Sequence, residues 1–95
     1  METSKVILGE IVMSSNGEEI GAISEILVNE KTGKAEYGIL SFGGFMGIGK
    51  KLIAAPIDAM IFNEDGNFYE LNVDIETLED ANIQIEHNGR SYFLF

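Results

Sequence analysis

The chain has 95 residues, with 16 acidic and 6 basic side chains and a single histidine, which gives a formal net charge of −10 at pH 7. This charge argues against direct binding to nucleic acid, which needs several Lys or Arg side chains on phosphates, and against anionic lipid surfaces. The absence of cysteine excludes disulfides, thiolate nucleophiles and zinc–thiolate sites. An apolar content of 45% is typical of a folded protein, and the length predicts one domain over residues 1–95.

No stretch of the sequence approaches the roughly 20 apolar residues that a membrane-spanning helix needs. Residues 1–5 lack the basic and then apolar pattern of a signal peptide. We therefore expect no membrane insertion and a protein that acts in the cytoplasm.

Turn signals recur about every ten residues with short β-branched runs between them, a spacing that predicts an all-β barrel or sandwich. The first three strands are predicted at residues 6–13, 20–28 and 34–42. The Asn16-Gly17 pair after the first strand is a strong hairpin signal, because both central residues of such a turn need φ > 0.

The faces of the second and third strands follow from simple alternation. In the second strand, Ile23 and Leu27 are predicted on one face and Ile26 on the other. In the third strand, Tyr37 and Ile39 are predicted on one face, with the opposite face formed by Leu40 and Phe42.

The second half begins with a glycine-rich loop at 43–51. A strand at 52–55 ends at Pro56, the only proline, which cannot donate to a ladder. Residues 57–62 are predicted as a short strand or 3₁₀ segment, and 68–73 as a strand. One or two helical turns follow at 74–81, with Asp74 as the predicted N-cap.

The last fourteen residues, 82–95, have the pattern of a separate hairpin around Asn88-Gly89. A two-residue turn there pairs His87 with Arg90, Ile85 with Tyr92 and Ile83 with Leu94 on one mostly apolar face. Phe93 and Phe95 then lie on the other face with Gln84 and Glu86.

Two groups of apolar residues are candidates for contact with another chain. The glycine loop carries Phe45, Met46 and Ile48, which either form a contact patch or fold back over one end of the barrel. Phe93 and Phe95 either cover one end of the barrel or form an exposed strip on an edge strand, where strand addition or a symmetric dimer would use them.

Sequence motifs for cofactors, metals and catalysis are weak. The loop at 44–51 matches a P-loop except that Lys51 stands where Ser or Thr should bind magnesium, and a proline-terminated strand follows in place of a helix. The alternation of Asn63, Asp65 and Asn67 lacks the glycine position and the final glutamate of a calcium loop, and a turn explains it. His87 is the only histidine, and no nucleophile elbow is present. We expect no enzyme activity, catalytic residue, cofactor or metal.

Acidic residues are concentrated in the second half of the chain. Residues 52–89 contain nine Asp or Glu and no Lys or Arg. Such a region is a solvated face that keeps the protein soluble, a docking surface for a basic partner, or an adaptation to high salt.

The run from Leu8 to about Ala81 resembles the PRC-barrel family. The pattern that carries the resemblance is LGEIV, NGEEIGAI, TGKAEYGIL, GGFMGIGKK, AAPI and ETLEDA, in this order and spacing. The resemblance implies a small closed or partly open barrel of about six strands with a core at about 5–81, extended here by the hairpin at 82–95. The aromatic residue that the family has after the proline is Ile57 here.

Members of that family include the cytoplasmic domain of the photosynthetic reaction-centre H subunit and a domain of a ribosome-maturation factor, and some archaeal members are associated with cell division. What they share is protein contact, and the family pattern has no catalytic residues to carry over. The resemblance therefore implies a protein-interaction or assembly module that binds a protein partner, expected here as a homodimer. The alternatives are a factor associated with ribosomes or RNA processing that acts through protein contacts, and a protein that binds a small ligand or a metal.

Overall fold

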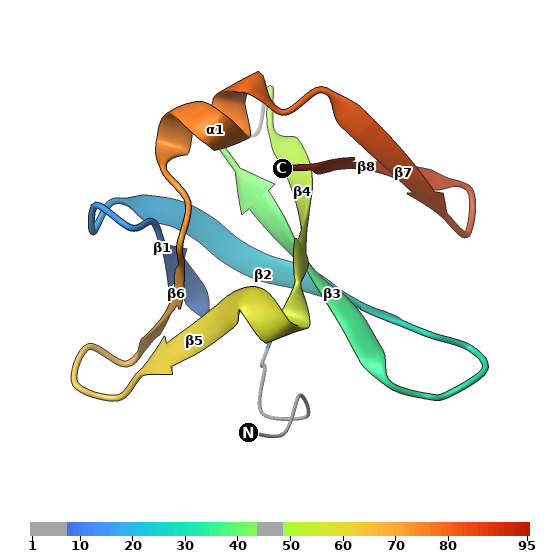
Figure 1. Ribbon diagram of the computed structural model, residues 1–95, viewed down its shortest axis with the longest axis horizontal. Coiled ribbons are helices and arrows are strands. Elements are labelled where there is room, and N and C mark those ends of the chain that lie inside the picture. Colours follow the sequence, from blue (N-terminus) through green and yellow to red (C-terminus); the bar gives the residue numbers. More distant parts are fainter. Residues whose placement is uncertain (1–7, 44–48) are drawn as a thin grey trace.

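The computed structural model describes residues 8–43 and 49–95. In these residues eight strands form one mixed sheet in the order β5-β6-β1-β2-β3-β4-β8-β7, and the two end strands, β5 and β7, do not pair with each other. The all-β class, the short helix and the C-terminal hairpin are therefore as predicted, and the barrel is open (Figure 1). The elements are β1 (Ile11–Met13), β2 (Glu19–Val28), β3 (Ala35–Phe42), β4 (Lys51–Pro56), the 3₁₀ helix η2 (Ile57–Ala59), β5 (Met60–Asn63), β6 (Phe68–Leu71), α1 (Ile75–Asp80), β7 (Ile83–His87) and β8 (Arg90–Leu94).

Most strand pairs are antiparallel neighbours in the chain, as expected for short connections. Two parallel pairs join distant segments: β1 with β6, and β4 with β8. The β4–β8 ladder consists of the single pair Ile53 and Phe93. Side-chain packing, more than backbone pairing, must therefore hold the C-terminal hairpin to the rest of the sheet.

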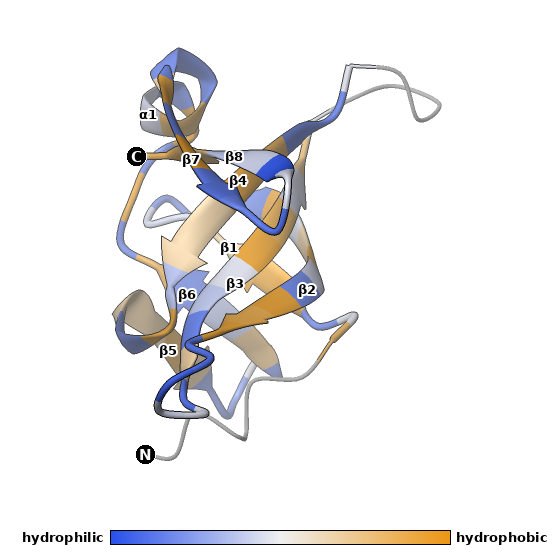
Figure 2. Cartoon of the chain, turned by 90° about the vertical axis from the view of Figure 1, so that its right-hand side faces the viewer, coloured by the Kyte–Doolittle hydropathy of each residue, from blue (hydrophilic) through white to orange (hydrophobic). Residues whose placement is uncertain are grey.

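The sheet has two hydrophobic clusters, one on each face. The main cluster fills the inside of the open barrel, and α1 closes it with Leu78, which is fully buried. The second cluster lies on the opposite face of β3 and β4. Its fully buried members are Leu27, Ile39, Ala54 and Tyr92. Figure 2 shows the hydrophobic residues gathered in the strands and the hydrophilic ones in the turns.

The presence of a cluster on each face explains why the sequences of β3 and β4 have apolar residues at successive positions. Leu40 and Ile53 point into the main cluster, whereas their neighbours Ile39 and Ala54 point into the second one. A strand buried on both faces needs apolar residues at successive positions. The predicted faces of β3 are confirmed, since Tyr37 and Ile39 pack in one cluster and Leu40 and Phe42 in the other.

The simple alternation predicted for β2 is wrong. Ile23 belongs to the main cluster and Leu27 to the second one, while Ile26 packs against the main cluster. The register with β3 shifts between Ile23 and Glu25, which makes a β-bulge at Ser24 and exchanges the faces beyond it. The Ser24 hydroxyl donates to the carbonyl oxygen of Ile39 at 3.1 Å across the bulge.

Two other predictions need correction. β1 begins at Ile11 and not near residue 6, because Gly9 has a φ of 87° and turns the chain just before it; residues 6 and 7 lie outside the described part. The turn at Asn16-Gly17 has a positive φ at Gly17 alone. The buried Ser14 sets it, since its Oγ accepts the backbone N–H groups of Asn16 and Glu18, each at 3.2 Å.

Candidate functional site

The C-terminal hairpin consists of β7 and β8, joined by a two-residue turn at Asn88-Gly89. Asn88 and Gly89 have φ values of 53° and 78°, which is the type I′ geometry that an Asn-Gly turn favours. The predicted pairs of His87 with Arg90, Ile85 with Tyr92 and Ile83 with Leu94 are confirmed. The local turn thus fixes which side chains lie on each face of the hairpin.

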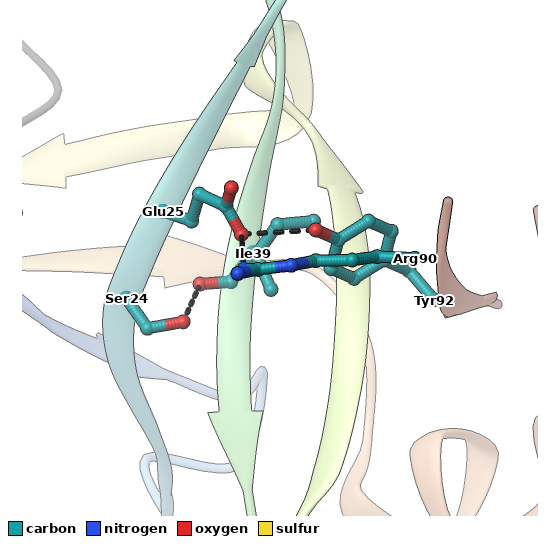
Figure 3. Close-up of polar contacts among 5 residues, drawn as sticks. All are labelled: Ser24, Glu25, Ile39, Arg90 and Tyr92. Carbon is teal, nitrogen blue, oxygen red and sulfur yellow. Dashed lines mark hydrogen bonds and ion pairs between the residues drawn. The ribbon is translucent and has the colours of Figure 1, made fainter. Parts of the chain in front are cut away.

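One face of the hairpin packs on the outside of the sheet. Tyr92 is 1% exposed and belongs to the second cluster, with Ile85 and Leu94 packed against it. Its hydroxyl donates to Oε1 of Glu25 on β2 at 2.9 Å (Figure 3). The same oxygen lies 3.6 Å from Nη1 of Arg90. Three residues from two distant segments therefore share one polar contact at the edge of an apolar cluster.

This environment changes the ionisation of Tyr92. Burial is the larger cause that raises the pKa of its phenol, and the hydrogen bond and negative charge of Glu25 raise it further. The neighbouring Arg90 acts in the opposite direction. The phenol is therefore held in its neutral, donating form.

The other face of the hairpin meets the main cluster. Phe93 is partly buried against that cluster, and Nζ of Lys51 lies 4.6 Å from the centre of its ring. The same ammonium group donates to the carbonyl oxygens of Leu78, Glu79 and Ala81 at 3.0, 3.0 and 2.5 Å. Because α1 has no basic residue in its last turn, Lys51 caps its C-terminus from β4. One ammonium group thus joins β4, α1 and β8.

The five residues predicted for partner contact have different positions. Phe45, Met46 and Ile48 lie outside the described residues. Phe93 is partly buried against the main cluster of its own chain. Phe95 is 42% exposed at the end of the chain.

The edge strand of this region is β7, not β8. β8 lies between β4 and β7 in the sheet, and no described strand pairs with the outer side of β7. Ile83 on β7 is 64% exposed, and the sequence reasoning did not select it. The hairpin register places it beside Leu94 on an apolar face, but only the three-dimensional structure shows that the second cluster does not extend far enough to cover it.

A shallow cavity of about 510 Å³ lies between β2 and the hairpin turn. Its charged and titratable side chains are Glu25, Glu30, His87, Arg90 and Tyr92, of which Arg90 and Tyr92 already contact Glu25. In residues 8–43 and 49–95, no group of three His, Asp or Glu side chains is arranged to hold a metal ion. The contacts of Arg90 and Tyr92 with Glu25 hold the hairpin turn against β2.

None of the helices in the described part of the chain has the length and hydrophobicity required to cross a membrane.

Comparisons with known proteins agree with this architecture. A family model described as the PRC-barrel domain matches residues 3–78. A search of the curated proteins finds no match. The matched segment contains β1 to β6 and most of α1, whereas the C-terminal hairpin follows it. Since the model covers well over half of the 95 residues, the chain belongs to the PRC-barrel domain family.

Proposed function

We propose that this PRC-barrel domain is a non-catalytic protein-interaction module that works as a homodimer and uses its C-terminal hairpin as the contact surface. The observation that carries the proposal is the outer edge of β7. This strand has no described neighbour on its outer side, and Ile83 on it is largely exposed to solvent. An edge strand with free backbone groups and exposed apolar side chains favours pairing with another chain.

The two ends of the sheet differ in how well they suit this role. β5 has four residues, whereas β7 has five. A longer open edge offers more backbone groups to a second strand, so β7 is the better surface. Phe95, which follows β8 directly, adds a second exposed apolar side chain to the same end of the hairpin.

The experiment compares the wild type with a double variant, Ile83→Glu with Phe95→Glu, by light scattering after size-exclusion chromatography. We expect a dimeric wild type and a monomeric variant with an unchanged circular dichroism spectrum. Both side chains are exposed, so the variant keeps its core. Phe93→Glu is unsuitable because Phe93 packs against the main cluster.

The matched control is Ile61→Glu on β5, at the other end of the sheet. Ile61 is 67% exposed and its substitution should leave the dimer intact. A monomeric wild type at high concentration, or a double variant that stays dimeric, would overturn the homodimer at this surface.

A basic protein partner is the second candidate, and the charge distribution favours it. The long acidic stretch at 52–89 has no Lys or Arg of its own. The adjacent Lys51 turns its ammonium group onto helix carbonyls and the Phe93 ring, so it pairs with none of those acids. A factor that contacts basic ribosomal proteins would present such a surface. Co-purification that weakens with salt would support this candidate.

A further inference from the structure

The hairpin turn determines which backbone groups of β7 point outward. His87 and Arg90 flank the two-residue turn, and a β-turn joins its first C=O to its last N–H. Along an antiparallel strand, residues alternate between pointing their backbone polar groups at the partner and away from it. His87, Ile85 and Ile83 therefore face β8, whereas Gln84 and Glu86 direct their N–H and C=O groups to the open edge.

Symmetry then limits how two β7 strands can pair. In a symmetric dimer the same strand meets itself, and a two-fold axis across two edge strands makes them antiparallel. Only outward-facing residues can form the hydrogen-bonded pairs. The axis must therefore pass through Gln84, through Ile85 or through Glu86.

Side-chain chemistry distinguishes these three registers. An axis at Glu86 sets two carboxylates directly opposite each other, which is destabilising. An axis at Gln84 sets Glu86 against Asn82, which lies outside β7 and so shortens the ladder. An axis at Ile85 sets Gln84 against Glu86 of the second copy on one face of the sheet. On the other face it brings the two Ile85 side chains together and sets each Ile83 against His87.

We infer that two copies of this chain join along β7 in the Ile85-centred register, so that their sheets form one continuous sheet. The inference rests on the proposed homodimer and adds its geometry. Gln84 and Glu86 exchange their backbone hydrogen bonds with the second copy, and the Gln84 amide donates to the Glu86 carboxylate. The exposed Ile83 is covered, and the paired Ile85 side chains connect the two second clusters across the axis.

The chain has no cysteine, so single cysteines report the register directly. Ile85→Cys places two thiols opposite each other in a non-hydrogen-bonded pair, where Cα atoms lie about 4.5 Å apart, within the range of a disulfide. Under a mild oxidant we expect it to cross-link at least about tenfold faster than Ile61→Cys on β5, because pairing raises the effective thiol concentration. Gln84→Cys and Glu86→Cys should cross-link slowly when each is alone.

The equimolar mixture of Gln84→Cys and Glu86→Cys is the second, independent readout. Both residues are exposed, so these variants stay folded even if Ile85→Cys, which is half-buried, does not. We expect the mixture to form the mixed disulfide faster than either variant alone.

The outcomes separate this inference from the proposed function. A wild type that is monomeric by light scattering overturns both. A dimeric wild type in which Gln84→Cys alone, Glu86→Cys alone or Ile61→Cys cross-links fastest keeps the homodimer and overturns this register. If the wild type is dimeric but none of the β7 variants cross-links faster than Ile61→Cys does by random collision, pairing along β7 is likewise overturned.

Discussion

At the scale of single residues, Lys51 has more structural roles than its place beside a glycine loop indicates. Its ammonium group supplies donors to three carbonyl oxygens at the C-terminus of α1 and lies against the Phe93 ring. The C-terminal carbonyls of a helix carry partial negative charge and have no partners within the helix. Lys51 therefore stabilises both the helix end and the attachment of the hairpin.

Replacing this ammonium group tests that role. Lys51→Met keeps a long apolar side chain but removes the ammonium donor from all three carbonyls, of which Leu78 keeps the Ala81 N–H at 3.3 Å, and we expect it to lower the free energy of unfolding by about 1–3 kcal/mol. Urea denaturation followed by circular dichroism measures the change. Lys50→Met is the matched control, because Lys50 is exposed and has the same charge; its effect should stay within about 0.5 kcal/mol. Equal effects of the two substitutions would contradict the capping role.

Tyr92 gives a prediction that depends on pH. The folded state holds its proton more tightly than the unfolded chain does, because its pKa is raised from the ordinary value of 10.0. The resulting stabilisation is fully present below pH 10 and is lost as the pH rises through the higher pKa of the folded state. Tyr92→Phe removes the phenol, so the variant should lose less stability than the wild type between neutral pH and strongly alkaline pH.

At neutral pH the same variant should be less stable by about 1.5 kcal/mol, the low end for a hydrogen bond to a charged group, since Glu25 is partly solvated. Urea unfolding at a series of pH values measures both effects. Tyr69 also has a raised pKa, caused by burial and then by Glu10, so some alkaline loss should remain in the variant. Identical pH profiles for wild type and variant would show that Tyr92 does not contribute.

At the scale of elements, the sequence predicts what local chemistry decides. The hairpin of β7 and β8 has the predicted register because Asn88-Gly89 determines it within four residues. The Asp74 cap is also confirmed, since its carboxylate accepts from the Thr77 N–H at 2.8 Å. These two local signals are therefore read correctly from the sequence, whereas the Asn16-Gly17 turn differs from its prediction because the buried Ser14 side chain determines it.

Contacts between distant segments are the part that sequence reasoning misses. The bulge at Ser24 depends on how β2 meets β3, and the place of β8 beside β4 depends on one parallel pair of residues 40 positions apart, Ile53 and Phe93. No local pattern signals either contact. For this reason the edge strand and the exposed Ile83 could not be identified before the three-dimensional structure.

Gly21 shows how such a contact constrains one element. The structure places this glycine where β2 and β3 approach so closely that a Cβ would lie 2.0 Å from the backbone oxygen of Ser41. Backbone atoms cannot move aside as a flexible side chain can. A side chain at this position must therefore separate the two strands.

We accordingly expect Gly21→Ala to destabilise the fold by more than about 2 kcal/mol, at the upper end for single substitutions. Gly33→Ala is the comparison. A Cβ added at Gly33 would meet no atom within 4 Å, so only the positive φ of 74° disfavours the new residue. That penalty is about 1–2 kcal/mol. Thermal unfolding of both variants measures the difference, and a Gly21→Ala protein as stable as Gly33→Ala would contradict the close approach.

At the scale of the whole molecule, the open edges of the sheet favour a homodimer, whereas the net charge opposes it. The open sheet leaves β5 and β7 at its two ends, on opposite sides of the molecule (Figure 1). A net charge of −10 makes two copies repel each other. A homodimer must form against this repulsion, whereas a complex with a basic partner gains from the same charge.

Salt therefore separates the two candidate functions by sign. Raising the ionic strength from about 0.01 to about 0.15 M shortens the Debye length from about 30 to about 8 Å and screens repulsion between the two acidic copies. We expect the dissociation constant of the homodimer to fall several-fold over this range, as measured by sedimentation equilibrium. A dissociation constant that rises with salt would mean that opposite charges hold the two copies together, and it would contradict an interface built mainly on the apolar and amide side chains of β7. A complex of the acidic surface with a basic partner should instead weaken over the same range of salt, because screening reduces attraction between opposite charges.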